Sequence, residues 1–396
     1  MESAVSYDLI VVGAGPAGST LAREMAGQGA RVLLLDRAHF PRDKPCGGGV
    51  TLRAARLLPL DLTPVVEQTV FRAYVSLRCG PGFVRSYPEP LTYMTQRCRL
   101  DSFLAERAAE AGVDFRDGVR VRTVELGATG VQVRTEGDVF QASAVAGADG
   151  AYGVVAAALG LAPYVESAVA LEGNLPCADR VLKRWRDLVA LDLGGLPGGY
   201  GWVFPKSDHV NVGVGAWRYA APALRGYLAR LCRHFGFSEE RLRDVRGHLL
   251  PMRRPGAPIV RGPGLLLGDA AGLVDPLSGE GIYGALLSAR LAAPALRDYL
   301  AGQAPDLSSY ERAVDREIMA DLVTSRRLQE VFHCTPAPYV AALRLSDYLW
   351  RSLCRIIRGD ISYSHFRHRL GIVRPVLDGW SEVARRRNNT RRPKGR

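Results

Sequence analysis

The segment Leu9–Asp36, LIVVGAGPAGSTLAREMAGQGARVLLLD, decides the fold. It opens with an apolar run rich in β-branched residues, which is typical of a strand buried on both faces of a parallel sheet. A G-x-G-x-x-G turn follows, then a helical stretch from Ser19 to Gln28 that Gly29 can end, and a second strand from Arg31 to Leu35. A strand, glycine turn, helix, strand and acid in this order predict a dinucleotide-binding unit.

Each glycine of the turn has its own task. Gly13 permits the tight turn, Gly15 lets the backbone approach a pyrophosphate, and Gly18 lets the helix pack close to the strand. The helix N-terminus offers free N–H groups to the phosphates. Asp36 can accept hydrogen bonds from a ribose diol and would repel a 2′-phosphate, so NADP is disfavoured at this site.

Three later segments carry related signals. An apolar strand from Gly262 ends in Gly268-Asp269 and is predicted to open a helix, with Gly279–Ile282 following closely. An acid beside a helix N-terminus suits a second sugar-phosphate contact, here on the ribityl side of a flavin. The other two segments are Arg97–Asp101, which leads into a helix predicted to reach Gly112, and Ala146–Gly150, an apolar strand ending in Gly-Asp-Gly.

These four elements resemble, in this order, the flavoproteins that include aromatic hydroxylases, halogenases and geranylgeranyl reductases, over residues 7 to about 295. Lys44–Gly49 is similar to the Pro-Cys-Gly stretch of geranylgeranyl reductases, and Tyr200–Lys206 resembles their Tyr-x-Trp-x-Phe-Pro-Lys motif. The resemblance implies FAD as the cofactor. The cofactor-binding residues that it implies are Gly13, Gly15, Pro16, Ala17, Gly18, Asp36, Cys46, Gly47, Gly49, Arg97, Val121, Asp149, Asp269, Gly281 and Ile282.

Several of these positions have a plain structural alternative. Cys46 could be a buried structural thiol, but its glycine neighbours favour a place beside the flavin. Paired aromatic residues on a strand are usually core, and Lys206 could be a surface residue that follows the strand. The family motif favours a substrate cavity lined by Tyr200, Trp202, Phe204 and Pro205. Cys46 and Tyr200 are the candidate catalytic residues, as members of a proton network.

The element order predicts an α/β protein: a Rossmann-like FAD-binding domain with an inserted antiparallel β-sheet substrate domain and a C-terminal helical region. The FAD-binding domain is expected to comprise residues 1–62, 93–160 and 255–298, and the substrate domain residues 63–92 and 161–254. Residues 299–383 are expected to be helical. Within them, one amphipathic helix over Leu343–Ile357 would close the cavity or lie on a membrane surface.

Charge and cysteine content narrow the function classes. The net charge of +12 falls to +5 without the seven basic residues of the tail, residues 384–396. This tail is predicted to be disordered, and to be solubilising or to contact an anionic membrane; no zinc-finger spacing or basic aromatic helix predicts nucleic-acid binding. Seven cysteines without a Cys-x-x-Cys pattern suit the reduced thiols of a cytoplasmic protein. No signal peptide, spanning helix or metal site is expected.

The combined signals predict an FAD-dependent reductase that saturates C=C bonds of a polyprenyl chain on a lipid, quinone, chlorophyll precursor or diphosphate. The reduced flavin would deliver a hydride to one alkene carbon while a proton reaches the other, in a cavity that excludes water. A second dinucleotide turn is missing, so the electron donor, NAD(P)H or reduced ferredoxin, would bind transiently. The alternative is an FAD-dependent monooxygenase acting on an aromatic or polyketide ring.

Overall fold

The fold is described from a computed structural model that covers residues 6–127, 130–161 and 165–365. Its first sheet has the strand order β17-β18-β11-β1-β2-β8, with β9 and β10 attached beside β11. The strands are β1 (Ser6–Val12), β2 (Val32–Leu35), β8 (Asp114–Arg116), β9 (Thr123–Leu126), β10 (Val131–Arg134), β11 (Val139–Gly147), β17 (Val260–Arg261) and β18 (Gly264–Leu266). The pairs β1–β2, β1–β11, β2–β8 and β11–β18 are parallel. This is the predicted dinucleotide-binding sheet.

Helices pack against the glycine turn and against one another. The helix α1 (Pro16–Gly27) contacts both α3 (Arg97–Glu110) and α7 (Ile282–Leu300). The helix α1 begins at Pro16, earlier than predicted. Proline fits the first helical position, because the N–H that it lacks would have no partner within the helix. The helix expected directly after Asp269 is only one turn, Gly268–Ala271, which Gly272 ends with a φ of 73°. The long helix starts instead at Ile282.

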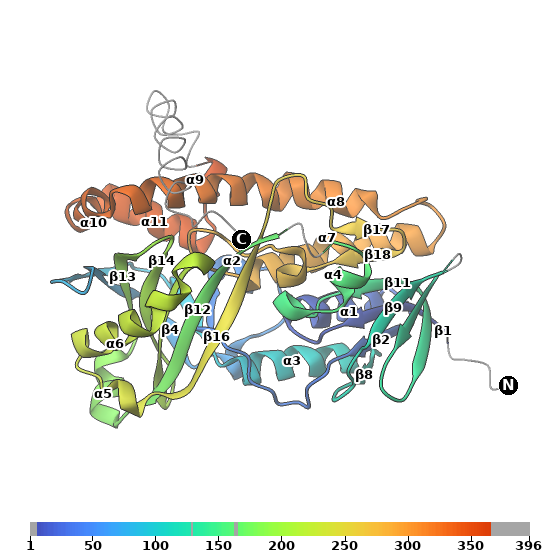
Figure 1. The fold of residues 1–396 in the computed structure, drawn as a ribbon, viewed down its shortest axis with the longest axis horizontal. Helices are drawn as coiled ribbons and strands as arrows, with labels where there is room; N and C mark the ends of the chain where they lie inside the picture. Colours follow the sequence, from blue (N-terminus) through green and yellow to red (C-terminus); the bar gives the residue numbers. More distant parts are fainter. Residues whose placement is uncertain (1–5, 128–129, 162–164, 366–396) are drawn as a thin grey trace.

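A second sheet, with the order β16-β12-β15-β14-β13-β5-β6, lies beside the first (Figure 1). Its strands are β5 (Arg72–Leu77), β6 (Phe83–Ser86), β12 (Val165–Pro176), β13 (Leu188–Leu196), β14 (Gly199–Pro205), β15 (His209–Trp217) and β16 (Arg243–Arg253). The expected antiparallel pairing holds except between β5 and β13, which are parallel. The long connection between these two strands permits the crossover that parallel pairing needs.

The strand predicted over Val70–Leu77 is broken at Phe71. Its first part belongs to a small third sheet, ordered β3-β7-β4, and its second part is β5. The small sheet consists of β3 (Gly49–Thr51), β4 (Gln68–Val70) and β7 (Thr92–Met94). It carries the chain from the dinucleotide sheet to the substrate sheet. The boundaries that we assign to the two domains stay a prediction.

The C-terminal helices run along one side of the molecule, over both large sheets (Figure 1). They are α8 (Ser308–Val314), α9 (Ala320–Cys334), α10 (Pro336–Leu345) and α11 (Asp347–Arg358). The single helix predicted over Leu343–Ile357 is wrong, because the chain breaks at Ser346. The Ser346 hydroxyl accepts the Leu349 N–H at 3.2 Å and so starts a new helix. The remaining α-helices are α2 (Leu52–Ala55), α4 (Val155–Ala158), α5 (Asp179–Trp185) and α6 (Leu224–His234).

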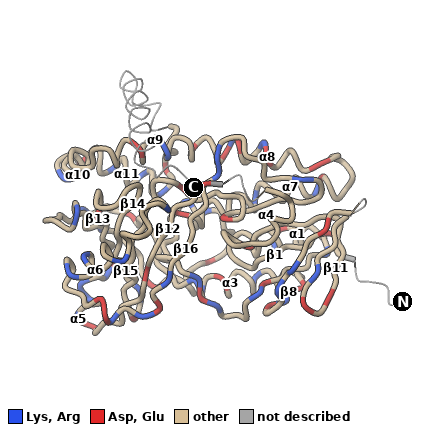
Figure 2. Tube along the Cα trace, viewed as in Figure 1, with Lys and Arg blue, Asp and Glu red and all other residues tan. Residues whose placement is uncertain are grey.

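Basic and acidic residues are interspersed along the described chain (Figure 2). The predicted basic tail, residues 384–396, lies outside the described residues. Among the helices that the structure describes, none combines the length and the apolar character that a bilayer span requires.

The contact between α1 and β1 yields a stability prediction. A Cβ added at Gly18 would lie 1.9 Å from the Gly13 carbonyl oxygen, whereas a Cβ at Gly27 in the same helix would meet nothing within 4 Å. We expect Gly18→Ala to lower the free energy of unfolding by about 1–3 kcal/mol, the usual cost of overpacking. Gly27→Ala should leave it unchanged or raise it by up to about 1 kcal/mol. Urea unfolding measures both, and equal effects would contradict the predicted packing.

Candidate functional site

A cavity of about 1010 Å³ runs through the described part of the molecule. One end is formed by the glycine turn and the carboxyl ends of β1 and β2, and the other by the apolar faces of β5, β13, α10 and α11. A cavity at the carboxyl edge of a parallel sheet is where open α/β folds bind their ligands. The predicted cofactor and substrate residues therefore face one continuous space.

The glycine turn forms a cradle that two arginines face. Gly13 has a φ of 102°, and a Cβ there would lie 2.4 Å from the Ala148 carbonyl oxygen, so a larger residue is excluded. A Cβ placed on Gly15 would approach only the guanidinium groups of Arg42 and Arg97, at 3.7 and 3.8 Å. Since no side chain caps α1, its first N–H groups are also directed at this space. Free N–H groups and two cations fit a diphosphate.

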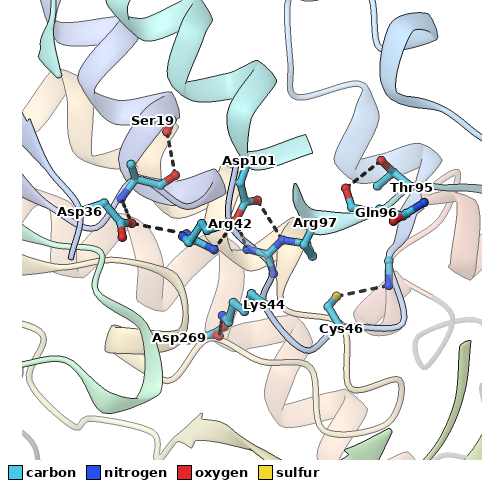
Figure 3. Close-up of polar contacts among 12 residues, drawn as sticks. Ser19, Asp36, Arg42, Lys44, Cys46, Thr95, Gln96, Arg97, Asp101 and Asp269 are labelled. Atoms are coloured by element: carbon cyan, nitrogen blue, oxygen red, sulfur yellow. Dashed lines mark hydrogen bonds and ion pairs between the residues drawn. The ribbon is translucent and has the colours of Figure 1, made fainter. Parts of the chain in front are cut away.

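A buried ion-pair cluster fixes those arginines (Figure 3). The Arg97 guanidinium binds Asp101 through two hydrogen bonds of 2.8 Å, and Arg42 approaches the same carboxylate at 2.8 Å. Arg42 also lies 3.5 Å from the Asp36 carboxylate, so the cluster places two cations between two anions beside the turn. Asp36 is fixed further by the Ala14 and Ala38 N–H groups, which its carboxylate accepts at 2.9 and 3.0 Å.

Two further carboxylates face the cavity. Asp269 lies 2.9 Å from the Lys44 ammonium and 4.0 Å from the His248 ring. Burial alone would raise the pKa of Asp269, but Lys44 and His248 hold it well below its usual range. Asp149 accepts the Val154 N–H at 2.7 Å through one oxygen, while its other oxygen is buried and lacks a protein partner. A buried oxygen without a partner suits a donor on a bound ligand.

The inner face of β14 forms the wall between the two ends of the cavity. Tyr200, Trp202 and Phe204 alternate along the strand, and neighbouring ring centroids are 6.0 and 6.1 Å apart. The Trp202 N–H donates to the side-chain oxygen of Asn211 at 2.7 Å. The Tyr200 hydroxyl donates to the Ser278 carbonyl, and burial raises its pKa, so the phenol stays protonated.

The segment Cys46–Gly48 packs directly onto this aromatic wall. A Cβ on Gly47 would lie 2.7 Å from the Phe204 ring, and Gly48 has a φ of 67°. The Lys206 ammonium donates to the Gly47 and Thr95 carbonyls at 2.7 and 2.8 Å, and this side chain is only 2% exposed. The alternative that Lys206 is a surface residue is therefore wrong, because its ammonium replaces water with two main-chain carbonyls.

Of the residues predicted for the site, only Gly18 and Pro205 lie off the cavity wall. Gly18 packs against Gly13 inside the fold, and Pro205 pairs with Val210 at the end of β14. The structure brings the other predicted cofactor and substrate residues to the wall: Gly13, Gly15, Pro16, Ala17, Asp36, Cys46, Gly47, Gly49, Arg97, Val121, Asp149, Tyr200, Trp202, Phe204, Asp269, Gly281 and Ile282. Their individual roles stay predictions.

Sequence reasoning missed Glu172, Arg42 and the pairing role of Lys44. Glu172 is 7% exposed and accepts the Cys46 N–H. The signal that could have found it is an acid within the apolar strand Val169–Asn174. Among the described residues, no group of three or more histidine, cysteine, aspartate or glutamate residues could hold a metal ion.

The Arg97–Asp101 pair gives a second stability prediction. Arg97→Met leaves the fully buried Asp101 with Arg42 alone, so we expect a loss of about 3 kcal/mol of unfolding free energy. Arg107→Met on the same helix breaks a surface pair with Glu110 and should cost at most about 1 kcal/mol. Urea unfolding compares them. Adding Asp101→Leu to Arg97→Met should restore part of the loss, and a further loss would argue against this account.

Comparison with known proteins defines the family. A family model described as "FAD binding domain" matches residues 6–186. A chloroplastic geranylgeranyl diphosphate reductase of Oryza sativa subsp. japonica is 31% identical over 399 residues, covering 88% of this chain and 82% of that protein. A menaquinone reductase of Mycobacterium tuberculosis is 36% identical over 314 residues, covering 74% of this chain and 76% of that protein.

Solved structures share the fold. A geranylgeranyl bacteriochlorophyll reductase-like protein of Thermoplasma acidophilum matches with a TM-score of 0.69 at 23% identity, covering 91% of this chain and 93% of that chain. A flavin-dependent brominase matches with a TM-score of 0.74 at 19% identity, covering 97% of this chain and 100% of that chain. The fold class predicted from the sequence is confirmed. Together with the sequence relatives, the glycine cradle and the aromatic wall, this shows that the chain belongs to the geranylgeranyl reductase family of FAD-dependent oxidoreductases.

Proposed function

We propose that this enzyme saturates C=C bonds of a polyprenyl chain carried by a lipid, quinone, chlorophyll precursor or diphosphate. One observation supports this most: the cavity passes without interruption from the diphosphate cradle, past the aromatic wall of β14, to an apolar end. An apolar space that continues from a flavin site suits an apolar, chain-like substrate. Relatives named for geranylgeranyl diphosphate and menaquinone reduction support the same class.

The residues at the polar end fit FAD. The diphosphate would rest on the turn Gly13–Ala17 between Arg42 and Arg97, and Asp36 would bind the adenosine ribose. Asp269, Gly281 and Ile282, which line the same cavity, would hold the ribityl chain and the ring system. When bound and reduced, the flavin supplies the hydride.

The apolar end would hold and align the prenyl chain. It is lined by Val75 of β5, Val189 of β13, and Trp350, Leu353 and Ile357 of α11. Burying such a chain contributes about 0.8 kcal/mol per CH₂, which can position an unactivated alkene without polar contacts. The same walls exclude water from the reacting carbons.

Cys46 and Tyr200 are the proposed members of the proton-delivering network. The Tyr200 phenol is partly buried on the cavity wall and protonated, and the Cys46 thiol lies on the same wall. The electron donor that we propose is NAD(P)H or reduced ferredoxin, which would bind transiently. A peripheral contact with an anionic membrane through the tail after residue 384 would bring the enzyme to a lipid substrate.

The second candidate is an FAD-dependent monooxygenase. The structural similarity to a flavin-dependent brominase supports it, because that protein shares nearly the whole fold. Oxygen consumption separates the two. A monooxygenase should consume oxygen when substrate is added, whereas a reductase should turn over under anaerobic conditions.

The direct test is anaerobic incubation with dithionite and lipids or quinones that carry geranylgeranyl chains. We expect a mass gain of one H₂ for each saturated bond. The Tyr200→Phe and Cys46→Ala variants should lower this turnover while retaining bound FAD. No mass gain with any prenyl lipid, prenyl diphosphate or menaquinone would refute the proposal.

The cavity walls predict a dependence on chain length. Leu353→Trp enlarges a side chain that lines the apolar end, so it should raise KM for a geranylgeranyl substrate several-fold and leave a geranyl substrate little affected. Tyr348→Trp serves as the control, because Tyr348 is on the outer face of the same helix and 69% exposed. Steady-state kinetics with both chain lengths measures the effect. An equal change for both lengths would place the chain elsewhere.

A further inference from the structure

The segment Cys46–Gly48 is held by two buried charged residues, Glu172 and Lys206, to which the sequence assigned no role. On one side, the Glu172 carboxylate on β12 accepts the Cys46 N–H at 2.5 Å. On the other side, the Lys206 ammonium at the end of β14 donates to the Gly47 carbonyl at 2.7 Å. The Cys46 N–H is thus bound by a negative charge from β12, and the Gly47 carbonyl is bound by a positive charge at the end of β14.

The packing leaves this segment little freedom. A Cβ on Gly48 would lie 2.0 Å from the Thr95 carbonyl oxygen and 2.5 Å from the Lys206 ammonium. The Gly48 N–H also approaches the Cys46 sulfur at 3.4 Å, so the thiol is folded back over its own turn (Figure 3). The place of the sulfur on the cavity wall is therefore tied to the place of the backbone.

We propose that Glu172 and Lys206 are positioning residues of the reductase, which set where Cys46 stands against the cofactor, and that the charge on Glu172 governs how tightly the segment is held. Neither residue is proposed to touch the reacting atoms. The inference rests on the proposed function only in taking the cavity beside Cys46 as the flavin site.

Burying the charges of Glu172 and Lys206 costs free energy, which suggests that the two residues have a function beyond stability. Taking a carboxylate and an ammonium out of water costs several kcal/mol each unless partners compensate. A neutral amide at position 172 could accept the same N–H. The carboxylate differs from the amide in attracting Lys206, the anchor on the other side of the segment. A charged Glu172 thus draws the two anchors together around Cys46–Gly48.

The surroundings leave Glu172 able to change its charge near neutral pH. The titratable groups that face it are Asp43 and Cys46 from the preceding loop, Lys206 from the end of β14, and Arg246 from β16. Arg246 is 3.5 Å from Asp43, so these two largely compensate one another. Burial raises the pKa of Glu172 to about 7, and burial lowers the pKa of Lys206 to about 8.

The sign of the pH effect follows from the raised pKa. The folded chain binds the Glu172 proton more tightly than the unfolded chain, so the contribution of this group to stability falls as pH rises through about 7. Above that pH the carboxylate is charged and attracts Lys206. Below it, the carboxyl group is neutral and resembles glutamine.

The test measures the reactivity of Cys46 in the full chain, with and without FAD. Iodoacetamide labelling, followed by peptide mass spectrometry, gives the rate constant at Cys46 from below pH ~6 to above pH ~8. We expect the ratio of the Glu172→Gln rate to the wild-type rate to be near unity at low pH and to rise several-fold between pH about 7 and 8, where Glu172 is charged and Lys206 is still protonated. The half-buried Cys98, measured in the same digests, should show a ratio near unity throughout.

Lys206 is tested in parallel. Lys206→Met should speed Cys46 labelling several-fold and shift the visible absorption of bound FAD, since the segment loses its anchor at Gly47. Lys183→Met removes an exposed lysine of α5 and should change neither readout. If a single variant fails to fold, the double variant Glu172→Gln/Lys206→Met, which leaves no unpaired charge, carries the comparison.

Identical pH profiles in the wild type and in folded Glu172→Gln, with an unchanged flavin spectrum in Lys206→Met, would overturn the inference. Neither readout requires a substrate. A failed reductase assay beside a changed Cys46 profile would therefore reject the proposed function alone.

Discussion

The contact between the Cys46–Gly49 segment and the inner face of β14 is the constraint on which the site depends. The segment belongs to the part of the chain that follows the dinucleotide unit, and β14 belongs to the second sheet. Phe204 leaves no room for a side chain at position 47, and Lys206 binds the carbonyl of the same residue. This contact joins the cofactor end of the cavity to its substrate end. It requires glycine at positions 47 and 48, because a Cβ at either position would collide with the substrate sheet or with Thr95.

Electrostatics divides the cavity in the same way. At the polar end, Arg42 and Arg97 share Asp101, and Arg42 also pairs with Asp36, so charged groups of both signs face the glycine turn. At the apolar end the walls are aliphatic and aromatic side chains of β5, β13 and α11. The proposed pair of ligands matches this division, because FAD carries an anionic diphosphate and a prenyl chain is apolar throughout.

The sequence predicted what local chemistry dictates and missed what long-range packing decides. The glycine turn, Asp36 and the aromatic motif were recognisable because each needs particular residue types at fixed spacing. Glu172 was not recognised, and Lys206 was recognised as part of the motif but without a role, since both roles arise only when β12 and β14 bring these residues to either side of Cys46. Similarly, the apolar periodicity of Leu343–Ile357 favoured one helix. The structure has two helices there, because the Ser346 side chain caps the start of the second.

The parallel pairing of β5 with β13 has a consequence for folding. Arg72–Leu77 must wait for Leu188–Leu193, while α3, β8, β9, β10 and β11 are formed from the chain between them. Sheets closed by such distant segments form slowly, because the loop entropy is lost before the contacts are gained. The substrate sheet therefore cannot be completed as an early local unit during synthesis. The cavity has walls from both large sheets, so it is complete only when this distant pairing has formed.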